Sequence, residues 1–246
     1  MNSRKPRAGA LVVVTAFLLG SVAAAAQVEV GAFSQAQPGA AFPAGWQPLA
    51  FPRIERHTAY RLVADEGTTV VRADADASAA GLIRRIEVDP QRYPLLAWRW
   101  KIAGVVAKAD ATRREGDDYA ARIYVAFKYD PDRVSWFNRA KYALIRLIYG
   151  EYPPHAGINY VWDNRLAPGT VLPNAYTDRV RMIVVRSGDA DANRWVAEER
   201  NLLEDYRRAF GEEPPPVSGV AIMTDTDDTR SQASAWYGDI AFRSAP

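Results

Sequence analysis

Three aspartates crowd into four positions of the stretch MTDTDDTRSQASAWYGDI. Asp225, Asp227 and Asp228 follow an apolar run, so we expect them where a strand leaves a sheet and backbone carbonyls are partly free. Calcium requires such oxygen ligands at about 2.3–2.6 Å. The stretch is not an EF-hand, because Arg230 and Trp236 occupy the sixth and twelfth positions counted from Asp225, where that loop needs Gly and an acid. An ordinary turn, in which Asp and Thr bond to their own backbone, is the alternative.

A second acidic pair lies in GDDYAAR. Asp117 and Asp118 open a strand-like run, and Arg122 lies on its polar face. Successive strand residues point to opposite faces, so both acids serve one site only if a bulge brings them together. A glycosidase needs two carboxyl groups about 5 to 9.5 Å apart, which Asp118 and an acid of 225–228 would supply. The alternative is that strand-end acids pair with Arg114 or Arg122.

Aromatic residues mixed with acids favour a sugar-binding surface, because rings stack on sugars while carboxylates bond to hydroxyls. Tyr124 lies on the polar face of its run, and NYVWD and AWYGD bring Tyr and Trp next to Asp. The further candidate ligand contacts are Trp162, Asp163 and Tyr237. The residues that we predict to be core instead are Trp98, Trp100 and Trp236.

Missing residue types exclude several kinds of chemistry. The chain has no cysteine, so thiol catalysis, cysteine-ligated zinc and iron–sulfur sites are excluded. His57 and His155 are its two histidines, so a metal would be held mostly by oxygens, which favours calcium or magnesium. The absence of G-x-S-x-G and of a phosphate-cradling glycine loop argues against a serine hydrolase and against nucleotide chemistry.

Residues 1–26 are typical of an export signal. Arg4, Lys5 and Arg7 precede the apolar run ALVVVTAFLLG, and small residues follow. The run is too short for a bilayer anchor, so we expect cleavage near Gln27, a periplasmic or secreted protein, and no stable membrane anchor. Without this segment 28 basic residues face 29 acidic ones, a net charge of −1. Such a balance gives no reason to expect a nucleic-acid partner.

Period-two alternation predicts strands over most of the remaining chain. The predicted strands are TAYRLV, TTVVRA, GLIRRIEV, PLLAWRWKI, DYAARIYVAF, INYVWD, RVRMIVVR, VSGVAIMTD and AWYGDIAF. Because strands and helices do not alternate, we expect a mainly β fold, an antiparallel β-sandwich of jelly-roll type, in one domain over 46–246. Residues 27–45, rich in Ala, Gly, Gln and Pro, are expected to form a flexible lead-in.

Two short helical insertions interrupt the strands. Apolar residues follow helical spacing over 136–149, with Gly150 as a stop. This helix would pack on the sandwich or, since basic residues flank its apolar stripe, lie on a membrane surface. The second insertion begins at Asn201, which has capping-box spacing with Glu204, and ends at Gly211.

Four stretches, AAGLIRRIEVDPQRYPLLAWRWKI, GDDYAARIYVAF, YVWD and MTDTDDTRSQASAWYGDI, together resemble the bacterial exported family labelled domain of unknown function 3047. The resemblance covers nearly the whole chain after the signal and implies an exported β protein with no assigned reaction. The terminal WYGDIAF is similar to the closing strand of galactose-binding-like β-sandwich modules. That likeness implies a fold in which several modules hold a structural calcium and bind sugars on aromatic platforms.

Three functional hypotheses follow. The first is a non-catalytic module that binds a glycan or another hydroxyl-rich ligand of the cell envelope. The second is a carbohydrate-active enzyme that uses Asp118 with an acid of 225–228. The third is a structural or assembly partner in the envelope, acting through the helix at 136–149. The first two require the loops around Asp118, Trp162 and 225–228 to converge on one cleft.

Overall fold

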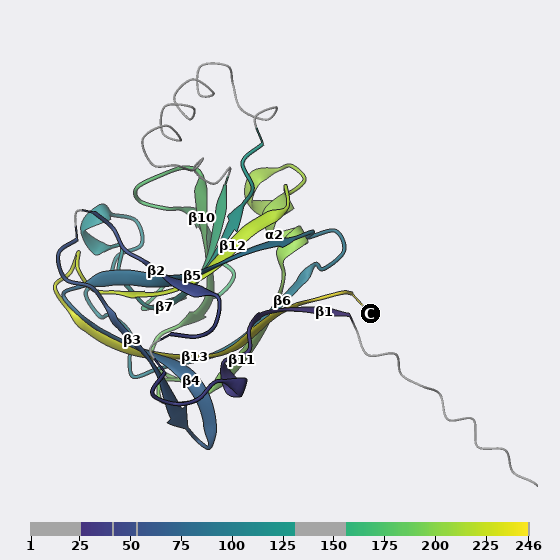
Figure 1. Cartoon of the computed structure of the whole chain (residues 1–246). Coiled ribbons are helices and arrows are strands. Elements are labelled where there is room, and N and C mark those ends of the chain that lie inside the picture. Colours follow the sequence, from purple (N-terminus) through teal and green to yellow (C-terminus); the bar gives the residue numbers. More distant parts are fainter. Residues whose placement is uncertain (1–25, 41, 53, 131–155, 246) are drawn as a thin grey trace, which may run out of the picture.

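Two β-sheets pack face to face and form a β-sandwich (Figure 1). The computed structural model describes residues 26–40, 42–52, 54–130 and 156–245. One sheet, named here the β13 sheet, contains β1 (Gln27–Gly31), β3 (Ala59–Asp65), β4 (Thr68–Asp76), β6 (Leu95–Ile102), β11 (Val196–Asn201) and β13 (Gln232–Arg243). The other, the β12 sheet, contains β2 (Trp46–Leu49), β5 (Ala79–Val88), β7 (Tyr119–Phe127), β8 (Gly157–Asp163), β9 (Val171–Pro173), β10 (Val180–Ser187) and β12 (Val217–Asp225).

The strand order differs from the sequence order in both sheets. The β13 sheet runs β11-β6-β13-β4-β3, and β1 pairs with the last residues of β13 on the side opposite β6. The β12 sheet runs β2-β5-β12-β7-β8-β10-β9. Each predicted strand is present, and the prediction of a mainly β sandwich is confirmed. Neighbouring strands therefore often come from distant parts of the chain.

One strand pair departs from the expected antiparallel arrangement. Among the described pairs, β8 and β10 run parallel and the others run antiparallel. After β8 the chain crosses to the sheet edge, forms β9 there, and returns as β10 between β8 and β9. The chain reverses its direction from β8 to β9 and again from β9 to β10, so β10 runs parallel to β8.

Aromatic side chains from both sheets meet in the core. Trp98 and Trp100 point inward from β6, and their neighbours along the strand point outward, as two-residue alternation requires. The Trp98 ring lies 5.3 Å from the Tyr160 ring, and the Trp100 ring lies 5.7 Å from the Trp162 ring. The prediction that Trp98 and Trp100 are core is confirmed.

Part of the segment predicted as a flexible lead-in, 27–45, has regular structure. Its first residues form β1, which pairs with β13, and a short 3-10 helix, η1 (Phe33–Gln35), follows. Val30 and Phe33 are buried, and the Phe33 ring lies 5.2 Å from the Trp46 ring. The composition of the segment is polar and small on average, but backbone pairing with β13 and these two buried apolar side chains hold its first part on the sandwich.

The two predicted helices have different outcomes. The second is confirmed as α2 (Leu202–Phe210): the Asn201 side chain accepts a hydrogen bond from the Glu204 amide, and Gly211 ends the helix at φ 73°. The predicted helix at 136–149 and the export signal at 1–26, apart from residue 26, lie outside the described residues. No helix of the described chain is long and apolar enough to cross a membrane.

Replacing Trp100 by Ala tests the core. The change removes a fully buried ring and should lower the free energy of unfolding by about 3–5 kcal/mol, measured by urea denaturation. Phe42→Ala is the control, because Phe42 is 44% exposed and its loss should cost less than about 0.5 kcal/mol. Equal effects of the two changes would contradict the packing described here.

Candidate functional site

The acids singled out in the sequence meet at one end of the β12 sheet, where β12 ends and β7 begins. β7 and β12 are antiparallel neighbours, and Asp225 at the end of β12 lies opposite Tyr119 at the start of β7. Asp118 directly precedes β7, while Asp227 and Asp228 lie in the loop after β12. One carboxylate oxygen from each of Asp118, Asp227 and Asp228 lies within 4.8 Å of the others. We call these three residues the acidic rim.

Asp118 holds the loop of the acidic rim in place. It is completely buried, and its two carboxylate oxygens accept hydrogen bonds from the backbone amides of Asp228 (3.3 Å) and Thr229 (2.7 Å). The backbone amide of Thr226 donates to the Ser78 carbonyl (2.9 Å), which fixes the start of the same loop. The loop is therefore anchored to both neighbouring strands of β12.

Asp117 and Asp118 serve the same region because Asp117 is not in the strand. The short 3-10 helix η2 (Arg114–Gly116) ends at Asp117, which has φ −75° and ψ 48°, and β7 begins at Tyr119. The bend removes the strict alternation of faces that an extended strand would impose. The Asp117 carboxylate accepts a hydrogen bond from the Asn174 amide (3.0 Å) and lies 3.8 Å from the Arg122 guanidinium.

Arg122 is buried behind the acidic rim and is paired with Asp225. Burial alone would lower the pKa of Arg122, but the negative charges of Asp225 and Asp117 raise it above its usual value. Asp225 is therefore the ion-pair partner of Arg122. It was predicted as a metal ligand together with Asp227 and Asp228, but the oxygen group that the structure brings together contains Asp118 in its place.

The outer members of the acidic rim are half-buried and face Tyr176. The Tyr176 hydroxyl lies 2.9 Å from both carboxylate oxygens of Asp228, and the Arg114 guanidinium lies 5.5 Å from the Tyr176 ring. Burial raises the pKa of Asp228 to about 6, although the hydrogen bond from Tyr176 lowers it. Burial also raises the pKa of Asp227 and of Asp117.

The other predicted ligand contacts do not join this end of the sheet. Trp162 and Tyr237 are each 1% exposed; the Trp162 indole donates to the Gly188 carbonyl, and the Tyr237 hydroxyl donates to the Met223 carbonyl. Both rings belong to the core, so the expected convergence of Trp162 with the acids is not found. Asp163 is also buried.

Two of these predicted residues have local packing roles. Asp163 accepts hydrogen bonds from the backbone amides of Arg165 and Leu166, so it caps the turn after β8. Tyr124 is half-buried on the outer face of β7, where its ring lies over Gly157.

A groove that was not predicted from the sequence crosses the outer face of the β13 sheet, with a volume of about 510 Å³. Glu199, Ala97, Ala241 and Glu29 form one cross-strand row over β11, β6, β13 and β1. The two central positions are alanines, so little side chain fills the space above the sheet. We call this feature the alanine groove. The polar side chains that line it are Gln27, Glu29, Gln35, Arg99, Glu198, Glu199, Asp239 and Arg243.

Two half-buried tryptophans, Trp195 and Trp236, lie outside the lining of the alanine groove and contact basic side chains of β6. The Arg99 guanidinium lies 4.6 Å from the Trp195 ring, and the Lys101 amino group lies 5.2 Å from Trp195 and 4.9 Å from Trp236. Trp236 was predicted to be core, which is wrong. Its neighbours Ala235 and Tyr237 are buried, so alternation turns Trp236 outward, and that signal was present in the sequence.

The charges of the alanine groove are partly paired. Glu199 pairs with Arg243 (3.2 Å), and Asp239 accepts hydrogen bonds from the amide and hydroxyl of Ser34 (2.8 and 2.5 Å). Arg99 lies across Gly238 and, among the described residues, has no acid within ion-pair distance. The groove therefore offers both hydrogen-bond acceptors and an available donor.

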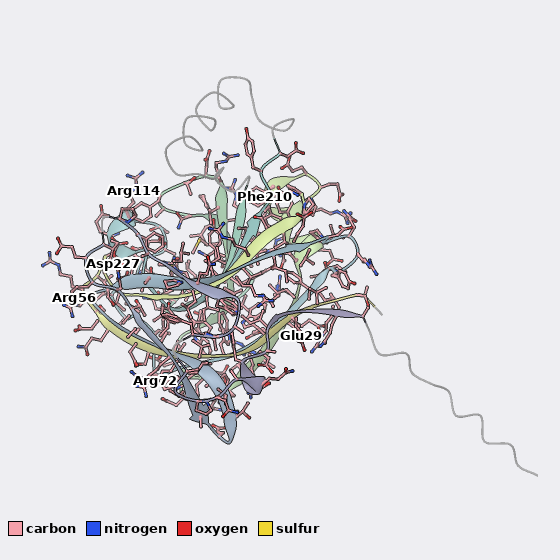
Figure 2. The ribbon with its side chains drawn as sticks, viewed as in Figure 1. Glu29, Arg56, Arg72, Arg114, Phe210 and Asp227 are labelled. Atoms are coloured by element: carbon pink, nitrogen blue, oxygen red, sulfur yellow. The ribbon has the colours of Figure 1, made fainter. Side chains whose placement is uncertain are left out.

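The acidic rim and the alanine groove are separate sites. Figure 2 shows Asp227 and Arg114 on one side of the molecule and Glu29, at the wall of the groove, on the opposite side. One ligand of ordinary size would contact one site only.

The glycosidase hypothesis lacks an accessible acid pair. Asp118 is completely buried, and both of its oxygens are occupied by backbone amides. An acid that protonates a glycosidic oxygen has to reach it directly. The geometry of Asp118 is that of a residue that positions a loop.

Comparisons with known proteins give a family but no activity. The family described as "Protein of unknown function (DUF3047)" matches residues 44–241. A search of the curated proteins finds no match.

Solved structures similar to the chain include a mutant of the family 29 carbohydrate-binding module CBM29-2 and the family 30 module of a Clostridium thermocellum cellulosomal cellulase. The first is 8% identical with a TM-score of 0.36, covering 89% of this chain and 91% of that one. The second is 11% identical with a TM-score of 0.37, covering 88% and 98%.

The α-L-arabinofuranosidase MgGH51 is 11% identical with a TM-score of 0.41, and the match covers 87% of this chain and 26% of the enzyme. The chain thus spans about a quarter of that enzyme's length. TM-scores this low carry no argument about function.

The raised carboxyl pKa values predict how stability depends on pH. Asp228 has a pKa of about 6 in the folded protein against an ordinary value of 3.8, so its stabilising contribution is complete below about pH 4 and is lost as the pH rises through about 6. Asp227 and Asp117 act in the same direction. In buffer with a chelator, the melting temperature should therefore fall between about pH 4 and pH 7.

Asp228→Asn should make this fall smaller, because the amide does not ionise. Asp178→Asn, on an exposed side chain, is the matched control and should leave the slope unchanged. If the Asp228 variant keeps the wild-type slope, ionisation of Asp228 is not what makes stability depend on pH.

Proposed function

The chain belongs to the DUF3047 family of proteins of unknown function, and we propose that it is an exported, non-catalytic β-sandwich that binds a glycan or another hydroxyl-rich ligand of the cell envelope. The observation that carries this proposal is the alanine groove, a hollow of about 510 Å³ with the Trp195–Arg99 stack beside it. Its volume lies within the range of about 300–1,000 Å³ in which proteins bind small molecules.

The side chains of the groove match the chemistry of a sugar. A sugar hydroxyl both donates and accepts hydrogen bonds, so its binding site needs carboxylates or amides together with an available donor. Glu29 and Glu199 supply acceptors at the two ends of the alanine row, and Arg99 supplies donors at its side. The half-buried Trp195 ring supplies an apolar face on which the C–H side of a sugar ring can stack.

The charges argue for a neutral ligand. The charged side chains that line the groove on the outer face of the sheet are the acids Glu29, Glu199 and Asp239 and two arginines, Arg99 and Arg243. Glu198 lies opposite the inward-facing Trp98 and pairs with Arg186. This excess of negative charge disfavours ligands rich in phosphate or sulfate. The polar walls also disfavour a purely apolar ligand, which would leave these groups without hydrogen bonds.

The groove is rigid before a ligand arrives. Its floor belongs to hydrogen-bonded neighbouring strands, and its side wall is fixed by Arg99, which is stacked on Trp195 and lies across Gly238. A preformed surface loses little conformational entropy when it binds. The export signal predicted at 1–26 supports an envelope ligand, because it would take the protein to that compartment.

Titration of the protein against a library of neutral cell-envelope oligosaccharides tests the proposal. At least one should bind, and Trp195→Ala should weaken that binding about tenfold, equivalent to about 1.4 kcal/mol. The expected loss is of the size that stacking and area burial by one aromatic ring supply. Isothermal titration calorimetry gives the dissociation constants.

Ala241→Leu is the second variant, because a larger side chain fills the floor of the groove without adding charge; it should weaken the same ligand at least tenfold. Lys128→Ala, which removes an exposed cation from the β12 sheet, is the matched control and should bind as wild type. Absence of binding across the library, or binding that neither variant changes, would reject the groove as the site.

A further inference from the structure

We propose that the acidic rim, Asp118, Asp227 and Asp228, is a calcium site that ties the loop after β12 to the start of β7. This inference concerns one end of the β12 sheet and does not depend on the alanine groove. The two sites lie on opposite sides of the molecule (Figure 2).

The spacing of the oxygens fits calcium. Calcium binds oxygens at about 2.3–2.6 Å, so ligands on opposite sides of the ion are about 4.6–5.2 Å apart. One oxygen from each residue of the acidic rim lies within 4.8 Å of the others, so three of the six to eight oxygens that calcium takes are already close enough to contact one ion. Magnesium, at about 2.0–2.1 Å, needs a smaller and near-octahedral set.

A buried oxygen beside the rim lacks a partner. Asp117 is 5% exposed. One of its carboxylate oxygens accepts a hydrogen bond from the Asn174 side-chain amide, and the other has no hydrogen-bond partner among the described residues. Leaving a buried acceptor unpaired costs about 1–3 kcal/mol. Asp117 precedes Asp118 directly, and the negative charges of Asp118 and Asp227 act on it. Arg122 lies 3.8 Å from the oxygen that Asn174 binds, so a cation bound at the neighbouring rim would act on the other, unpaired oxygen.

No ion pair among the described residues neutralises the rim. Arg122 forms ion pairs with Asp225 and Asp117. No described lysine or arginine forms an ion pair with Asp118, Asp227 or Asp228. Like charges this close repel each other in a partly dry site. A divalent ion removes that repulsion.

The existing hydrogen bonds are compatible with a metal. An ionised carboxylate has about four lone-pair sites, and the bonds that Asp118 accepts from two amides occupy two of them. Those amides belong to the loop that carries Asp227 and Asp228, so Asp118 fixes the positions of its partner ligands. Tyr176, which is 51% exposed, leaves the rim reachable from solvent.

Calcium binding to the full-length protein, first stripped with a chelator, tests the proposal by calorimetry and thermal melting. One calcium should bind, and calcium at 100 times its dissociation constant should raise the melting temperature by about 5–10 °C. Terbium, which replaces calcium and is excited through nearby aromatic rings, should luminesce until calcium displaces it. Magnesium should bind more weakly than calcium.

The double variant Asp227→Asn, Asp228→Asn keeps the side-chain shapes and removes two charges, so it should fold but lose the calcium heat, the melting shift and the terbium signal. Asp178→Asn is the matched control and should retain all three. No calcium binding by the wild type, calcium binding retained by the double variant, or tighter binding of magnesium would each overturn the proposal. Glycan titrations with and without chelator report on the groove independently.

Discussion

The stacking of Trp98 and Trp100 on the aromatic residues of β8 is the contact on which the rest of the structure depends. It fixes which face of β6 is buried. Because strand residues alternate, the same contact forces Ala97, Arg99 and Lys101 outward, onto the opposite surface. The floor and one wall of the alanine groove are therefore consequences of how the core packs. A substitution that turned β6 over would exchange the core and the groove, which explains why a single strand can specify both.

The acidic rim depends on a different constraint, the local bend before β7. Asp117 leaves the extended conformation, and the completely buried Asp118 then points its carboxylate at the amides of the next loop. Arg122 behind them pairs with Asp225, and in the part of the chain that the structure describes no lysine or arginine forms an ion pair with Asp227 or Asp228. The result is a buried ion pair between Arg122 and Asp225, with the half-buried outer members of the acidic rim nearer the surface.

The sequence allows the strands to be predicted well and the sites only in part. Alternation identifies each long strand, because inward and outward positions differ in polarity along the chain itself. It misses β1, β2, β9 and β11, which are short and stabilised by their neighbours. Convergence of Asp118 with the 225–228 loop was foreseeable, but the capture of Asp225 by Arg122 was not, because a bulge in β12 decides which acid turns inward. The alanine groove could not be predicted from the sequence, because its prediction requires the strand order in which β6 lies between β11 and β13.

Pairing of β1 with β13 joins segments that are about two hundred residues apart in the chain. Glu29 in β1 and Ala241 in β13 are direct partners in this pairing, and both line the groove. A chain in which β1 has not yet paired with β13 therefore lacks one wall of the alanine groove, even if its other strands have formed. The groove is complete only once this long-range pairing, which carries a large loop-closure cost, has formed.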